Sequence, residues 1–107
     1  MRNNDMPYYD PTQVKTIMGE NGASNDAKVL LYGDMADSYI NSFLVNVEDN
    51  IPITSPPTQL KKIATLLAVA YFFKFESGDT LTADQAEMIW NEYFKNKYKR
   101  PSFFITK

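Results

Sequence analysis

The chain has 107 residues, a hydrophobic content of 44% and a formal net charge of −2, and it contains neither cysteine nor histidine. This length predicts a single domain with a compact core. The missing cysteines exclude disulfides and thiolate metal sites, and the missing histidines remove the commonest metal ligand and neutral-pH general base. The longest apolar run, residues 63–73, is about half of the ~20 residues that span a bilayer. Residues 1–10 lack the apolar core of a signal peptide, so we expect a soluble intracellular product.

The charge is unevenly spread along the chain. Residues 1–60 hold three basic and eight acidic residues, a balance of −5, whereas residues 61–107 hold eight basic and five acidic residues, a balance of +3. Such asymmetry suits copies that pack acidic end against basic end. Two differently solvated faces of a monomer explain it equally well.

The first 26 residues predict an arm, a short helix and a loop. Residues 1–9 have no periodicity and are expected to form a flexible arm, which Tyr8 and Tyr9 would dock onto the body. Asp10 is a suitable cap for a helix that would end before Gly19 and turn Val14, Ile17 and Met18 to one face. Residues 20–26 are dense in turn-forming types and predict a loop.

A second helix is predicted over residues 27–44. Its apolar residues recur at spacings of three and four, and they are Val29, Gly33, Ala36, Ile40 and Phe43. Glycine costs a helix about 1 kcal/mol relative to alanine, so Gly33 indicates a close approach by another part of the chain.

Residues 45–58 contain three prolines and break the helical pattern. They predict an extended connection with an edge strand or one arm of a loose hairpin. The connection is long for so small a domain, and long loops are often binding segments.

Two more helices complete the predicted body. The third begins at Ser55 or Pro56 and runs to about Phe75, with an inward stripe of Leu60, Ile63, Ala64, Leu67, Ala68, Tyr71 and Phe75. The fourth runs over residues 82–98 behind a capping box of Thr82 and Gln85, with inward residues Ala86, Ile89, Trp90, Tyr93 and Phe94. The fold class is therefore mainly α: a bundle of about four helices, with a body over residues 10–99 and a C-terminal segment, residues 100–107.

Motifs for enzyme chemistry are lacking in this sequence. It has no glycine-rich phosphate loop, no Gly-x-Ser-x-Gly and no His-Glu-x-x-His, so we expect neither catalysis nor a cofactor or metal. Asp34 and Asp37 are three residues apart, but they are interpreted as a solvated face, as are four further acidic residues, Glu48, Asp49, Glu87 and Glu92. The basic and aromatic mixture over residues 95–100 suits nucleic acid, although the pI of about 5.0 argues against it.

The order of these segments resembles a known family. A capped stretch, YYDPTQVKTIMG, precedes the helical LLYGDMADSYINSFL, and the proline-containing NIPITSPPTQL leads into LKKIATLLAVAYFF and then MIWNEYFKNKYKR. Ala36, Asp37, Ile40 and Leu44 match one helical motif of the family, and Pro57, Leu60, Lys61, Ala64 and Ala68 match another. On these residues the chain resembles the head–tail connector, or head-completion adaptor, proteins of tailed bacteriophages and archaeal tailed viruses.

This resemblance implies a virion protein of the neck, assembled in the host cytoplasm. Its copies would form a ring, commonly a dodecamer, under the portal protein and above the next neck or tail-completion protein. DNA would pass through the lumen without sequence recognition, and no membrane would be involved. The candidate contact residues lie in the extended loop and near the C-terminal segment: Glu48, Asp49, Ile51, Ile53, Lys95, Lys99, Arg100, Phe103, Phe104 and Ile105.

Two other functions stay open at this point. A tail terminator, or another neck or tail subunit, would also be a ring of one small domain. A small helical DNA-binding regulator of a virus or mobile element would need residues 27–44 and the third helix to form a helix-turn-helix. About 13 residues separate these two helices, whereas such a turn has three to four residues.

Overall fold

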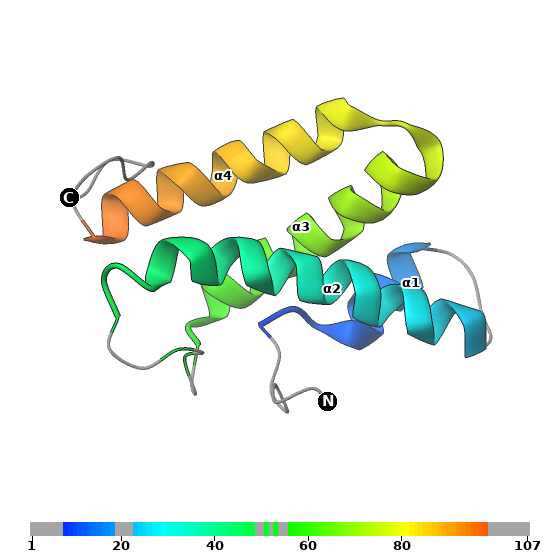
Figure 1. Cartoon of the computed structure of the whole chain (residues 1–107), viewed down its shortest axis with the longest axis horizontal. Helices are drawn as coiled ribbons and strands as arrows, with labels where there is room; N and C mark the ends of the chain where they lie inside the picture. Colours follow the sequence, from blue (N-terminus) through cyan, green and yellow to red (C-terminus); the bar gives the residue numbers. More distant parts are fainter. Residues whose placement is uncertain (1–7, 19–22, 49–50, 52, 54–55, 99–107) are drawn as a thin grey trace.

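The computed structural model describes residues 8–18, 23–48, 51, 53 and 56–98 (Figure 1). These residues form four helices, α1 (Pro11–Met18), α2 (Ala23–Leu44), α3 (Thr58–Ser77) and α4 (Thr80–Tyr98), and no strand. The mainly helical fold class is therefore confirmed. Residues 49, 50, 52, 54 and 55 of the predicted extended connection lie outside the described residues, so the edge strand or hairpin stays a prediction.

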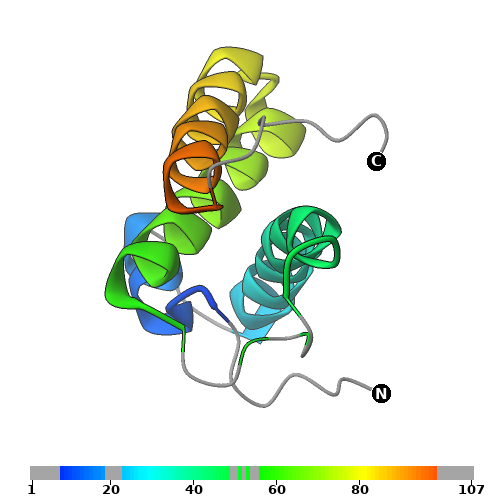
Figure 2. The same cartoon turned by 90° about the vertical axis from the view of Figure 1, so that its left-hand side faces the viewer.

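Helix α3 is central in the fold. It contacts α1, α2 and α4, and Figures 1 and 2 show α2 and α4 on two sides of it. Ten consecutive or near-consecutive residues of α3 are buried because neighbours cover most of its circumference: Leu60, Ile63, Ala64, Thr65, Leu67, Ala68, Val69, Ala70, Tyr71 and Phe72. The expectation that this helix forms the core is met at all but one position. The prediction that Phe75 faces inward is wrong, since its side chain is 55% exposed.

The helix ends follow local chemistry, with some corrections to the predicted bounds. Asp10 caps α1 as expected, because its Oδ1 accepts the amides of Thr12 at 3.1 Å and Gln13 at 3.3 Å. Helix α2 begins at Ala23, so residues 23–26 are helical and the predicted loop is wrong there. Helix α3 begins at Thr58, after the prolines.

The turn between α3 and α4 also differs from the prediction. Gly78 ends α3 with a φ of 77°, a conformation that glycine adopts without strain. Asp79, and not Thr82, caps α4: its Oδ1 accepts the amide of Thr82 at 3.1 Å and its Oδ2 accepts the Thr82 hydroxyl at 2.7 Å. This cap lets α4 begin two residues earlier than predicted, at Thr80.

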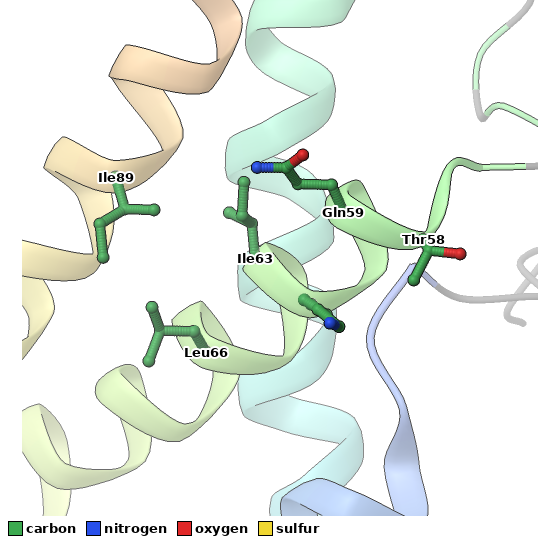
Figure 3. A pocket seen from close by; sticks show the side chains of 6 residues that line it. Thr58, Gln59, Ile63, Leu66 and Ile89 are labelled. Carbon is green, nitrogen blue, oxygen red and sulfur yellow. The ribbon is translucent and has the colours of Figure 1, made fainter.

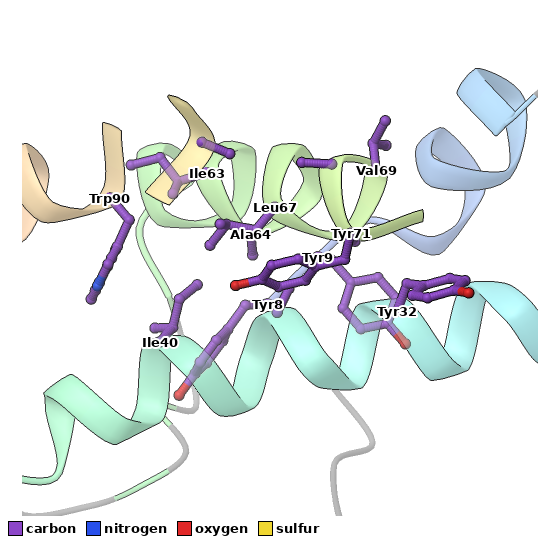
Figure 4. Packing of buried hydrophobic residues seen from close by; sticks show 14 of the residues in the cluster. Tyr8, Tyr9, Tyr32, Ile40, Ile63, Ala64, Leu67, Val69, Tyr71 and Trp90 are labelled. Carbon is purple, nitrogen blue, oxygen red and sulfur yellow. The ribbon is translucent and has the colours of Figure 1, made fainter. Parts of the chain in front are cut away.

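Tyr8 and Tyr9, which directly precede Asp10 and α1, lie between α2 and α3 (Figure 4), whereas the rest of the predicted arm, residues 1–7, lies outside the described residues. Both side chains are buried, and the ring of Tyr9 lies directly over Gly33, where a Cβ atom would overlap it. This contact is the close approach that the glycine predicted. The backbone of Asp10 adds a hydrogen bond to Oγ1 of Thr65 in α3 at 2.9 Å.

Aromatic side chains close the space between α2 and α4. The ring of Phe43 lies edge-on to Trp90, with centroids 5.6 Å apart, and to Phe94, with centroids 5.2 Å apart. Trp90 and Phe94 are fully buried. Such pairs stabilise a core beyond the area that they bury, so this cluster holds the C-terminal halves of the two helices together.

Candidate functional site

Several candidate contact residues are engaged inside the molecule. Glu48 is half-buried, and its Oε2 accepts the hydroxyl of Tyr98 at 2.7 Å, which connects the end of α2 to the end of α4. Ile51 and Ile53 pack against the core, and the amide of Ile53 donates to the Tyr8 hydroxyl at 2.8 Å. These contacts hold the beginning of the proline-containing connection against the helical body.

Of the remaining candidate contact residues, only Lys95 lies in the described part of the chain. Lys95 is exposed and pairs with Glu92 at 3.5 Å on the same helix face, a contact that is screened by solvent and contributes little to stability. The other candidates lie outside the described residues; they are Asp49, Lys99, Arg100, Phe103, Phe104 and Ile105.

Buried polar contacts join the helices at positions that sequence reasoning interpreted as solvated. Asp37 is only 4% exposed, and its Oδ2 accepts the amide of Tyr8 at 3.2 Å. Glu87 is half-buried, and its Oε2 accepts the hydroxyl of Tyr71 at 2.9 Å. The interpretation of Glu48 as solvated is wrong, since its Oε2 accepts the Tyr98 hydroxyl. The same interpretation is wrong for Asp37 and Glu87. Their partners are 29 and 16 residues away in the sequence, so local spacing carries no signal for either contact.

Burial and neighbouring carboxylates make several tyrosines weaker acids. The hydrogen bond to Glu76, at 2.7 Å, is the main cause that raises the pKa of Tyr32 to about 12. Burial, followed by the charge of Glu87, raises the pKa of Tyr39 to about 12. Burial is also the main cause that raises the pKa of Tyr71 and Tyr98 above the ordinary value. The fold therefore requires neutral phenols at these positions.

We expect the free energy of unfolding to fall as the pH rises from 10 towards 12. In this interval the unfolded chain, with tyrosine pKa values near 10.0, releases protons that the folded chain retains at Tyr32 and Tyr39. Rising pH therefore favours the unfolded state. Urea unfolding followed by circular dichroism at neutral pH and across this interval measures the decline. Tyr39→Phe removes one of the phenols and should make the decline shallower; an equal slope in that variant would contradict the assignment.

A groove between α3 and α4, called here the α3–α4 groove, is an open and largely apolar surface of the described residues. Its floor is Ile63, and its walls carry Leu66, which is 37% exposed, Ile89, which is 48% exposed, and Met88, which is 65% exposed. Figure 3 shows Ile63, Leu66 and Ile89 directed into the same space. The remaining lining residues are Thr58, Gln59, Lys62, Gln85, Glu92, Tyr93 and Asn96. The prediction that Ile89 faces inward is wrong.

A second hollow lies between α2 and α3. Its apolar lining includes Leu31, which is 53% exposed, and Phe75, which is 55% exposed and stacks on Tyr32 with ring centroids 6.1 Å apart. Its other lining residues are Asp34, Met35, Ser38, Tyr39, Ser42, Tyr71 and Lys74. Both hollows are open surfaces that suit docking of another polypeptide.

The described residues contain no group of three or more Asp and Glu side chains placed to hold a metal ion. None of the described helices combines the length and apolar character that crossing a membrane requires. Comparisons with known protein families, with curated proteins and with solved structures find no match.

Proposed function

We propose that this protein is a structural adaptor subunit of a tailed-virus neck, whose copies form a ring under the portal and link the head to the tail. The observation that carries the proposal is the α3–α4 groove, where Leu66, Met88 and Ile89 are left uncovered on two packed helices. Contiguous exposed apolar side chains of this kind mark protein contact sites. The class of partner is proposed from the sequence resemblance alone.

The way the body is tied together also supports a structural role. Tyr8 donates its hydroxyl to Asn41 at 2.7 Å and accepts the amide of Ile53, so the residues before α1 and the connection after α2 share one anchor. Tyr98 and Glu48 fix the end of α4 in the same region. A subunit that transmits load between a head and a tail benefits from such a rigid body, and the proposal gives the chain no catalytic step.

The test is co-purification with the portal protein encoded in the same genome. We expect the full chain, expressed with this portal and isolated through a tag on either partner, to form a complex that electron microscopy shows as a ring of copies on one face of the portal. The resemblance favours twelve copies. A chain that does not bind this portal, or a genome without a portal gene, would overturn the proposal.

The same preparation separates the rival functions. Binding to a tail tube and not to the portal would indicate a tail terminator. Retention on DNA that weakens steeply with salt would indicate a DNA-binding regulator, since neutralised phosphates release counterions.

A further inference from the structure

We propose that the C-terminal segment of one copy, residues 100–107, lies in the α3–α4 groove of the next copy. The inference rests on the proposed ring and names the contact that would join its subunits. The groove supplies an apolar floor and walls, and the segment supplies Phe103, Phe104 and Ile105 in succession. Three adjacent large apolar side chains match a groove whose open side chains include Leu66, Met88 and Ile89.

The rim of the groove suits an extended peptide. Gln59 on α3 and Gln85 and Asn96 on α4 are exposed amide side chains that line it. Each amide offers both a donor and an acceptor, so the three can pair with backbone groups of a docked segment. Backbone groups buried without such partners would oppose docking.

Charge indicates which end of the groove the segment enters. The segment begins with basic residues, Lys99 and Arg100, directly after α4. The charged residues that line the groove are Lys62 on α3 and Glu92 on α4, and Glu92 pairs with Lys95. Exposed Asp79 and Asp84 stand at the start of α4, whereas Lys95 and Lys97 stand near its end. Entry at the acidic end places unlike charges together and avoids like charges.

This direction requires a second copy. Asp84 lies 14 residues before Tyr98, a distance of roughly 21 Å along a helix that rises 1.5 Å per residue. Arg100 is two residues beyond Tyr98, and an extended chain covers at most about 7 Å in two residues. Within one copy the backbone of Arg100 therefore stays roughly 14 Å or more from that of Asp84, whereas a neighbouring copy can bring the two together.

A contact of this kind also explains how copies of the chain can close into a ring. Segment and groove are different surfaces, so each copy offers one of each and the contact propagates head to tail. Interfaces of this heterologous type generate rings when the rotation between copies closes. The opposite charge balances of residues 1–60 and 61–107 also favour head-to-tail packing of copies.

Cysteine pairing tests the contact, because the chain has no cysteine of its own. Full-length Ile89→Cys chain is mixed with full-length Phe104→Cys chain under mild oxidation, alone and with the portal. The control replaces Ile89→Cys by Ile17→Cys on α1, which has a matched exposure, 49% against 48%. We expect disulfide-linked dimers to form in several-fold excess over the control pair. The doubly substituted Ile89→Cys/Phe104→Cys chain should form linked multimers.

Two outcomes would overturn the inference. Equal cross-linking of the Ile89 and Ile17 pairs would mean that the segment has no preference for the groove. A doubly substituted chain that links within itself, as a monomer, would mean that its own segment fills the groove. If the chain binds the portal but the disulfide between positions 89 and 104 does not form, the proposed contact is refuted and the neck function stands. If the disulfide forms but the chain does not bind the portal, the neck function is refuted and the contact stands.

Discussion

Replacing Gly33 by alanine should lower the free energy of unfolding by about 1–3 kcal/mol, the range typical of overpacked cores. In an ordinary helix the same change stabilises by about 1 kcal/mol, because alanine has the better helix propensity. The expected sign is opposite here because a Cβ on Gly33 would overlap the far half of the Tyr9 ring. Tyr9 is 1% exposed and lies between α2 and α3, so a shift of its ring would disturb the side chains packed around it (Figure 4).

A second substitution isolates this cause. Tyr9→Leu removes the outer ring atoms that a Cβ would meet and keeps an apolar side chain over the helix. In that background Gly33→Ala should become neutral or stabilising by about 1 kcal/mol, so the effect of one methyl group changes sign. Urea unfolding of the unsubstituted chain, the two single variants and the double variant gives the four free energies of unfolding to compare. Destabilisation by Gly33→Ala in both backgrounds would show that the glycine is needed for another reason.

The fold was largely predictable because helical periodicity and capping chemistry are local. Val29, Ala36 and Ile40 recur at helical spacing and are buried, and Asp10 caps α1 where its type and position indicate. The start of α2 was not predictable in this way. Ser24, Asn25 and Asp26 belong to the residue types that favour both turns and helix N-termini, so the pattern alone does not separate a loop from a first turn.

Three errors in the predicted core share one cause. Ile17, Phe75 and Ile89 lie on the apolar faces of their helices, but each is about half exposed because no neighbouring helix covers that position. Periodicity gives the direction of a side chain around its own helix and carries no information about how far the neighbouring helix extends. The groove beside Ile89 could therefore be recognised only once the helices were placed.

Polar contacts were missed for a similar reason. A carboxylate such as Asp37 or Glu87 on a helix is solvated unless a distant donor reaches it, and the donors come from Tyr8 and Tyr71. The tyrosine content of the chain, seven residues, was the available signal, since buried phenols need hydrogen-bond partners.

Ile89→Lys should abolish assembly while leaving the fold intact. Ile89 is 48% exposed, so the free chain can place the lysine stem on the groove wall and keep the ammonium in water. A surface change of this kind alters stability by roughly 0.5 kcal/mol or less. In the assembled ring the same charge would be covered by an apolar partner, and Glu92, which lines the groove, already pairs with Lys95, so burial of the lysine is strongly unfavourable.

The expected weakening of assembly by Ile89→Lys follows from the position of Ile89 at the middle of the groove. Loss of a central contact typically costs about 2 kcal/mol or more, roughly a 30-fold weakening, and in a ring this loss is repeated at every subunit contact. The matched control is Ile17→Lys on α1, with an exposure of 49%, and Leu31→Lys, with an exposure of 53%, tests the α2–α3 hollow. Circular dichroism unfolding checks the fold, and electron microscopy with the portal checks the ring. If only Leu31→Lys prevents assembly, the contact belongs to the α2–α3 hollow. Since the three chains gain the same charge at positions of similar exposure, a selective loss in Ile89→Lys can arise only from what the groove binds.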